Sequence, residues 1–79
     1  MKRIEIRTTH AHPELVARAV SPDNTTEMRT DIDGGQVVTT IERESTGGLR
    51  TTADDYVVNL TVATRVAQLS DRLTETNYE

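Results

Sequence analysis

Apolar and polar residues alternate in three short stretches, which is the pattern of β-strands with one buried face. Residues 3–8 place Ile4 and Ile6 on one side and charged residues on the other, and residues 27–33 repeat this alternation. Residues 36–44 (QVVTTIERE) begin with apolar and threonine side chains on both faces. A strand of that kind is buried on both sides, so we expect it at the centre of a sheet.

Two further stretches have the periodicity of helices. In residues 10–21 (HAHPELVARAVS), Pro13 suits the first helical position, where its missing N–H costs nothing. The apolar stripe of this short helix is predicted to comprise Leu15, Val16, Ala19 and Val20. The residues SPDN at positions 21–24 end it, because a residue that precedes proline avoids the helical conformation.

The second helix is predicted from about residue 49 to about residue 73, and it carries two apolar stripes. The first consists of Leu49, Ala53, Tyr56, Leu60, Ala63 and Ala67, and the second of Val58, Val62, Val66, Leu69 and Leu73. A helix that lies on a sheet needs one stripe about 100° wide. Two stripes therefore predict two surfaces to bury.

The order strand, helix, strand, strand, helix predicts an α+β fold. Gly34 and Gly35 allow a tight hairpin between the second and third strands. A right-handed crossover from the first strand leaves room for the third between the other two, which gives the sheet order two, three, one. We expect both helices on one face of the sheet, and one domain spanning residues 1–79.

Composition adds an expectation of partners. A chain of 79 residues buries only about 60% of the surface that its unfolded form exposes, and without cysteine it has no disulfides to compensate. No apolar run is long enough to span a bilayer, and the alternating start does not resemble a signal peptide. We therefore expect a soluble, cytoplasmic protein.

The net charge of −4 argues against a free-standing nucleic-acid binder. Lys2 is the only lysine, and this acidic, lysine-poor composition suggests a salt-adapted organism. At high ionic strength the Debye length is only about 3 Å, so the net charge is then a poor guide to partners.

The stretch STGGLRTTADDYVVNL at residues 45–60 superficially resembles a phosphate-binding loop. A nucleotide site of that kind needs a lysine after the glycines, and Arg50 would have to replace it. We interpret the stretch instead as a loop that enters the last helix. Thr51 or Thr52 would cap this helix, with Asp54 and Asp55 in its first turn.

The remaining chemistry-bearing residues do not form a recognisable site. His10 and His12 have no evident third metal ligand nearby, whereas closed zinc sites need four ligands. Asp54 and Asp55 are neighbours on a helix and point about 100° apart. We expect no enzymatic activity, no metal and no cofactor. The GXXG loop of a KH domain and the sheet aromatics of an RRM are also absent.

Three segments in order resemble one family: PDN at residues 22–24, VVTTIERE at 37–44 and GGLRTTADDYVVNL at 47–60. Together they are similar to the small Pcc subunit of the KEOPS complex, and the resemblance covers nearly the whole chain. The family usually has serine before Leu-Arg, where this chain has Gly48. It often has Asn-Asp-Tyr where this chain has Asp54, Asp55 and Tyr56.

The resemblance implies a non-catalytic adaptor. Such a subunit forms a homodimer and packs its helices on helices of the catalytic ATPase-fold subunit, so that two enzyme copies are joined. The complex makes threonylcarbamoyladenosine beside the anticodon of tRNA. The expected partner-binding residues are Leu15, Ala19, Arg50, Tyr56, Leu60, Ala63 and Ala67, with Val62, Val66 and Leu69 able to exchange roles with them.

Arg3, Arg7 and Arg29 are candidate tRNA contacts, although arginines in this pattern more often belong to a solvated, charged strand face. Two other functions stay open at this point. One is a free-standing KH-like RNA-binding module, and the other is a small enzyme that uses a loop at Gly47 and Gly48.

Overall fold

The computed structural model describes the backbone of residues 1–75 and the side chains of residues 1–69. The elements follow the predicted α+β order. They are β1 (Lys2–Thr9), α1 (Pro13–Val20), the 3-10 turn η1 (Ser21–Asp23), β2 (Met28–Asp33), β3 (Gln36–Arg43) and α2 (Thr46–Glu75).

The three strands form an antiparallel sheet in the order β1-β3-β2, as predicted. In the register of β3, Ile41 lies opposite Ile4 of β1 and Thr39 opposite Thr30 of β2. Gly34 at the hairpin has a φ of +62°, a conformation that side chains other than glycine rarely adopt. The hairpin glycine therefore supports the tight turn between β2 and β3, and β3 is central because it also pairs with β1.

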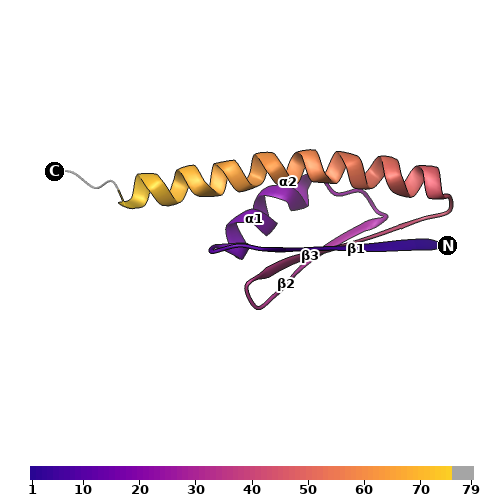
Figure 1. Cartoon of the computed structure of the whole chain (residues 1–79), viewed down its shortest axis with the longest axis horizontal. Coiled ribbons are helices and arrows are strands. Elements are labelled where there is room, and N and C mark those ends of the chain that lie inside the picture. The colour runs from indigo at the N-terminus through magenta and orange to yellow at the C-terminus, as the bar shows by residue number, and fades with distance from the viewer. Residues whose placement is uncertain (76–79) are drawn as a thin grey trace.

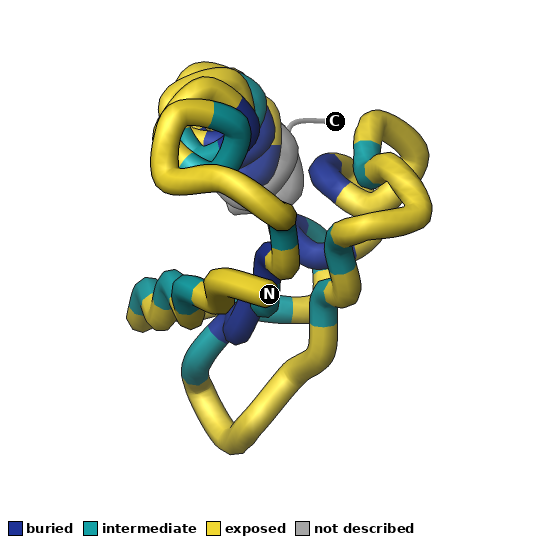
Figure 2. Tube along the Cα trace, turned by 90° about the vertical axis from the view of Figure 1, so that its right-hand side faces the viewer, coloured by how far each residue is buried: buried dark blue, intermediate teal, exposed yellow. Residues whose placement is uncertain are grey.

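Both helices lie on one face of the sheet (Figure 1). α2 packs over β3 and β1, and α1 packs over β2 and β3. Figure 2 shows the two helices side by side above the strands. The core between these layers consists of Val16, Ala17, Val20, Val37, Ile41, Tyr56, Leu60, Ala63 and Ala67.

Helix α1 faces the core through a slightly different stripe from the predicted one. Val16, Ala17 and Val20 are buried, whereas Ala19 is exposed and Leu15 is half-buried. The prediction of Ala19 in the stripe was wrong. Ala17 takes that role because the helix is rotated so that the side chains of Val16 and Val20 lie at the centre of its buried face.

Helix α2 begins at Thr46, three residues before the predicted start near Leu49. Ser45 caps it, since its Oγ accepts a 3.0 Å hydrogen bond from the N–H of Gly48. The predicted caps, Thr51 and Thr52, lie within the helix. Capping by Ser45 draws Gly47 and Gly48 into the first helical turn, so they are not part of a loop.

Helix α2 is much longer than the sheet beneath it. Its 30 residues correspond to about 45 Å, whereas a strand of 8 residues spans about 26 Å. In Figure 1 the C-terminal part of α2 runs past the end of the sheet. The helix therefore extends beyond the sheet that it covers.

The sheet face opposite the helices exposes little apolar surface. Val38 is the apolar residue of β3 on this face, and it is only 8% exposed. In the register it lies between Arg7 and Asp31, whose side chains share its face. This face therefore offers little apolar surface to a partner.

Candidate interaction surfaces

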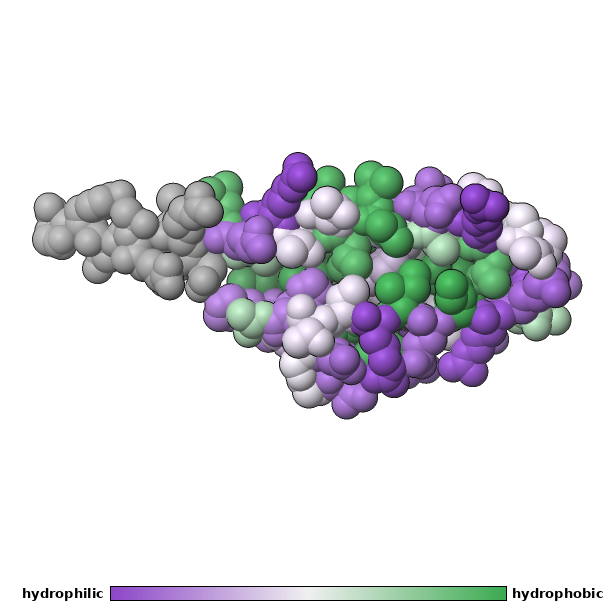
Figure 3. All heavy atoms as spheres, in the orientation of Figure 1, coloured by the Kyte–Doolittle hydropathy of each residue, from purple (hydrophilic) through white to green (hydrophobic). Residues whose placement is uncertain are grey.

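The second apolar stripe of α2 is exposed along the described part of the helix. Its described members are Val58, Val62, Val66 and Leu69, which are 63%, 57%, 52% and 53% exposed. The side chain of Leu73, which the sequence also assigned to it, lies outside the described residues. We call these four residues the outer stripe. Figure 3 shows apolar side chains exposed along α2 on the face in view.

The first stripe of α2 faces the protein's own core. Tyr56, Leu60, Ala63 and Ala67 are each at most 8% exposed, and Leu49 and Ala53 pack against the same core. The prediction that Tyr56, Leu60, Ala63 and Ala67 bind a partner was therefore wrong, because a partner cannot reach side chains that the sheet and α1 already cover. The exposed apolar surface of α2 is the outer stripe.

The three other predicted partner residues differ in how far they are exposed. Ala19 and Arg50 are exposed, on α1 and on the first turns of α2 respectively. Leu15 is half-buried and packs against the core. Ala19 and Arg50 therefore remain accessible to a partner, whereas Leu15 is largely committed to the domain itself.

A chain of hydrogen bonds crosses the core beneath α2. Thr39 Oγ1 donates to the phenolic oxygen of Tyr56 at 2.6 Å and lies 2.9 Å from Thr30 Oγ1. Asn24 Nδ2 donates to Thr30 Oγ1 at 2.7 Å. Burial raises the pKa of Tyr56, and the hydrogen bond from Thr39 opposes part of that shift. The chain links the loop after η1, two strands and α2, and so holds the first stripe inward.

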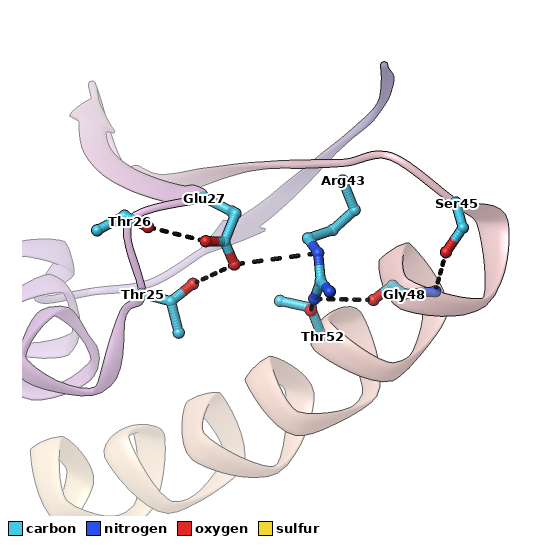
Figure 4. Close-up of polar contacts among 7 residues, drawn as sticks. All are labelled: Thr25, Thr26, Glu27, Arg43, Ser45, Gly48 and Thr52. Carbon is cyan, nitrogen blue, oxygen red and sulfur yellow. Dashed lines mark hydrogen bonds and ion pairs between the residues drawn. The ribbon is translucent and has the colours of Figure 1, made fainter.

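Arg43 holds the first turns of α2 against the sheet (Figure 4). Its Nη1 donates to Thr52 Oγ1 at 2.6 Å and lies 3.5 Å from the carbonyl oxygen of Gly48. Its Nε lies 3.9 Å from a carboxylate oxygen of Glu27. Arg43 therefore joins the end of β3, the start of β2 and the start of α2.

Gly48 leaves the space that the guanidinium of Arg43 occupies. A Cβ at this position would lie 3.2 Å from Arg43 Nη2 and 3.1 Å from Ser45 Oγ. Sequence reasoning missed this contact, although an arginine three residues before a helix start that contains two glycines was a usable signal. The stretch that superficially resembles a phosphate loop is thus explained by packing.

Glu27 receives further hydrogen bonds beside Arg43. Thr25 Oγ1 and Thr26 Oγ1 donate to its two carboxylate oxygens at 3.2 Å and 2.8 Å. These bonds lower the pKa of Glu27, with a smaller contribution from the charge of Arg43. The carboxylate is therefore kept charged opposite the guanidinium.

The sheet face opposite the helices forms a shallow, charged concavity of about 640 Å³. Arg3, Arg7 and Arg29, the candidate tRNA contacts, all line it, together with the carboxylates of Glu5, Glu27, Asp31, Asp33 and Glu42. Arg7 bonds Glu5 at 2.7 Å and Asp33 at 3.2 Å, and Arg29 bonds Asp31 at 3.0 Å. The structure brings the three arginines to one face, among carboxylates that offset their charge.

The two histidines do not converge on a metal site. His10 Nε2 lies 2.7 Å from Thr8 Oγ1, and His12 Nδ1 lies 3.9 Å from a carboxylate oxygen of Glu14. Both histidines line a small cavity of about 290 Å³ beside Thr64 and Gln68 of α2. Within residues 1–69, no group of three or more potential metal ligands comes together.

Asp54 and Asp55 are both exposed on α2, and they lie beyond its first turn because the helix starts at Thr46. The prediction that they stabilise that turn was therefore wrong.

In the part of the chain that the structure describes, no helix is long and apolar enough to cross a membrane.

Comparison with known proteins gives no neighbour. No protein-family model, no curated protein and no solved structure matches this chain. The fold and the exposed surfaces therefore carry the functional argument.

Proposed function

We propose that this protein is a non-catalytic adaptor subunit of a KEOPS complex, working in the cytoplasm. Its outer stripe would dock on helices of the catalytic ATPase-fold subunit that makes threonylcarbamoyladenosine in tRNA. Two copies of the adaptor would pair, so that two copies of the enzyme are joined.

The observation that carries the proposal is the exposed outer stripe on a helix whose other stripe is already buried. Val62 and Val66 are 57% and 52% exposed, although α2 already packs on the core through the first stripe. Apolar side chains at helical spacing on a free face are the pattern by which helices dock against partner helices. An adaptor role uses this surface directly, because docking on a partner would bury it.

Two further features support the same function. The element order agrees with the one expected from the resemblance, and the segment GGLRTTADDYVVNL lies in the N-terminal half of α2. An adaptor also needs no nucleic-acid site of its own. The mixed charge of the sheet face fits a role in which tRNA binds mainly to other parts of the complex.

The test is a binding measurement with the Val62→Asp variant and the purified catalytic subunit. A carboxylate in the centre of the outer stripe would have to be desolvated on docking, so we expect at least a tenfold loss of affinity. Thr61→Asp is the matched control, because Thr61 is the exposed neighbour about 100° around the helix. Wild-type affinity of a folded Val62→Asp variant would overturn the proposal.

Leu60→Asp is unsuitable for this test. Leu60 belongs to the core, so a loss of binding would report unfolding.

A further inference from the structure

A groove lies beside the N-terminal half of α2, between this helix and the segment that leads from η1 into β2. Its volume is about 610 Å³, and Asp23, Thr25 and Met28 line it from that segment. Figure 4 shows Thr25 on one side of it and Thr52 of α2 on the other. Val58, the first residue of the outer stripe, also lines it. The groove is therefore continuous with the apolar surface on which a partner helix is proposed to dock.

The groove carries negative charge that the chain itself does not match. Asp23 and Asp55 are exposed and line it from its two sides. No described residue forms an ion pair or a hydrogen bond with either carboxylate. Of the described residues that line the groove, Arg43 alone carries positive charge. Its guanidinium is already bound to Thr52 at 2.6 Å and lies 3.9 Å from the carboxylate of Glu27.

The position of Asp55 on α2 makes this charge part of the docking surface. Asp55 precedes Val62 by seven residues, which is close to two full turns, so it lies in line with the outer stripe. A helix that docks along the stripe meets Asp55 less than one turn beyond Val58. Removing water from an unpaired carboxylate is unfavourable unless the partner supplies a positive group. The docking helix therefore needs a positive group where it crosses the groove.

From this geometry we infer that the groove receives one arginine or lysine side chain of the helix that docks on the outer stripe. Asp55 and Asp23 bind the charged end of this side chain, and its aliphatic stem lies along Met28 and Val58. The inference rests on the proposed adaptor function, and it names the contact by which the adaptor recognises its partner.

The two ends of the outer stripe differ in charge, so the same contact sets the direction of docking. Asp55 lies at the end that begins with Val58, whereas Arg65 is exposed at the other end, four residues before Leu69 and adjacent to it on the helix surface. Apolar contacts alone would allow a partner helix to dock in either direction. Charged residues that flank such contacts fix the orientation. The partner helix therefore docks with its basic residue at the Asp55 end.

The primary test measures the affinity of Asp55→Lys for the purified catalytic subunit. Two like charges would then meet in the groove, so we expect a loss of at least about tenfold. The variant should remain folded, because Asp55 is exposed, and circular dichroism checks this. Asp54→Lys is the matched control, since Asp54 is also exposed on α2 but is not among the residues that line the groove. It should change the affinity by less than about twofold.

A charge exchange gives a second measurement and identifies the partner residue. Each arginine and lysine on the docking helices of the catalytic subunit is changed to glutamate in turn. One of these variants should bind the natural chain at least about tenfold more weakly. The same variant should bind Asp55→Lys more tightly than the natural catalytic subunit does, because the two charges of the pair have been exchanged.

Three outcomes would overturn the inference. They are natural affinity of a folded Asp55→Lys variant, an equal loss for Asp54→Lys, or a set of glutamate variants in which none restores binding to Asp55→Lys. Failure of the adaptor function gives a different result, in which the natural chain does not bind the catalytic subunit or Val62→Asp binds it normally, and the groove inference then fails as well. If Val62→Asp loses binding while Asp55→Lys keeps it, the adaptor function stands and only the groove inference is wrong.

Discussion

The Oγ1 atom of Thr39 lies 2.6 Å from the phenolic oxygen of Tyr56, in a core where both residues are at most 1% exposed. This contact joins the centre of β3 to the stripe of α2 that faces inward. Burial raises the pKa of Tyr56 above its ordinary value. The free energy of unfolding should therefore change with pH in the alkaline range.

The first prediction concerns that dependence. The unfolded chain loses the Tyr56 proton near pH 10, while the folded chain retains it to a higher pH. The free energy of unfolding should thus be independent of this group below about pH 10 and should fall as pH rises towards the folded pKa. Urea unfolding between pH 8 and 11 measures this. Tyr56→Phe should remove the decline above pH 10, and an unchanged decline would contradict the assignment.

The second prediction concerns the link between Arg43 and Thr52. Thr52→Val removes the acceptor of a 2.6 Å hydrogen bond while keeping the side-chain shape. It should cost about 1 kcal/mol and speed amide exchange in the first turns of α2. Thr51→Val is the control, because Thr51 is exposed on the same helix. Equal effects of the two variants would show that Arg43 does not hold the helix.

The third prediction compares the two glycines at the start of α2. A Cβ at position 47 meets no atom within 4 Å, whereas one at position 48 meets Arg43 at 3.2 Å. Gly47→Ala should stabilise the protein by about 0.5 kcal/mol, because it reduces the freedom of the unfolded chain. Gly48→Ala should lose that gain by displacing Arg43. Thermal unfolding distinguishes them, and stabilisation by both would contradict the packing role of Gly48.

The fourth prediction separates the two stripes of α2. Leu60→Ala should cost about 3 kcal/mol, because Leu60 is 8% exposed and its removal leaves a cavity. Val62→Ala should change the free energy of unfolding of the isolated chain by no more than about 0.5 kcal/mol, since Val62 is 57% exposed. Denaturant unfolding tests both. Similar costs at the two positions would mean that the isolated chain buries both stripes.

The periodicity of the sequence was enough to predict the strands and the sheet order. Alternation in residues 3–8 and 27–33 reflects one buried face, and a pattern of this kind survives because a shift of one residue would expose Ile4 and Ile6. The central position of β3 followed from the apolar and threonine side chains on both faces of residues 37–41. These predictions depend only on local patterns and on the handedness of the crossover.

The roles of the two helix stripes could not be predicted in the same way. Val62 is as apolar as Leu60, so composition alone does not decide which side faces the sheet. The inward stripe contains Tyr56, whose hydroxyl accepts a hydrogen bond from the buried Thr39, and this tertiary contact cannot be read from the sequence. The start of α2 was also missed, because Gly48 belongs to the helix through its contact with Arg43, which is a tertiary effect.

The part of α2 that runs past the sheet has a consequence for assembly. In the proposed adaptor, a subunit that binds to this extension lies away from the sheet, because no strands are beneath that part of the helix. Each of the two copies in that adaptor contributes one such extension. The length of α2 would then set the spacing between the two subunits that the adaptor connects, so deletions from its C-terminal end should shorten that spacing before they weaken the fold.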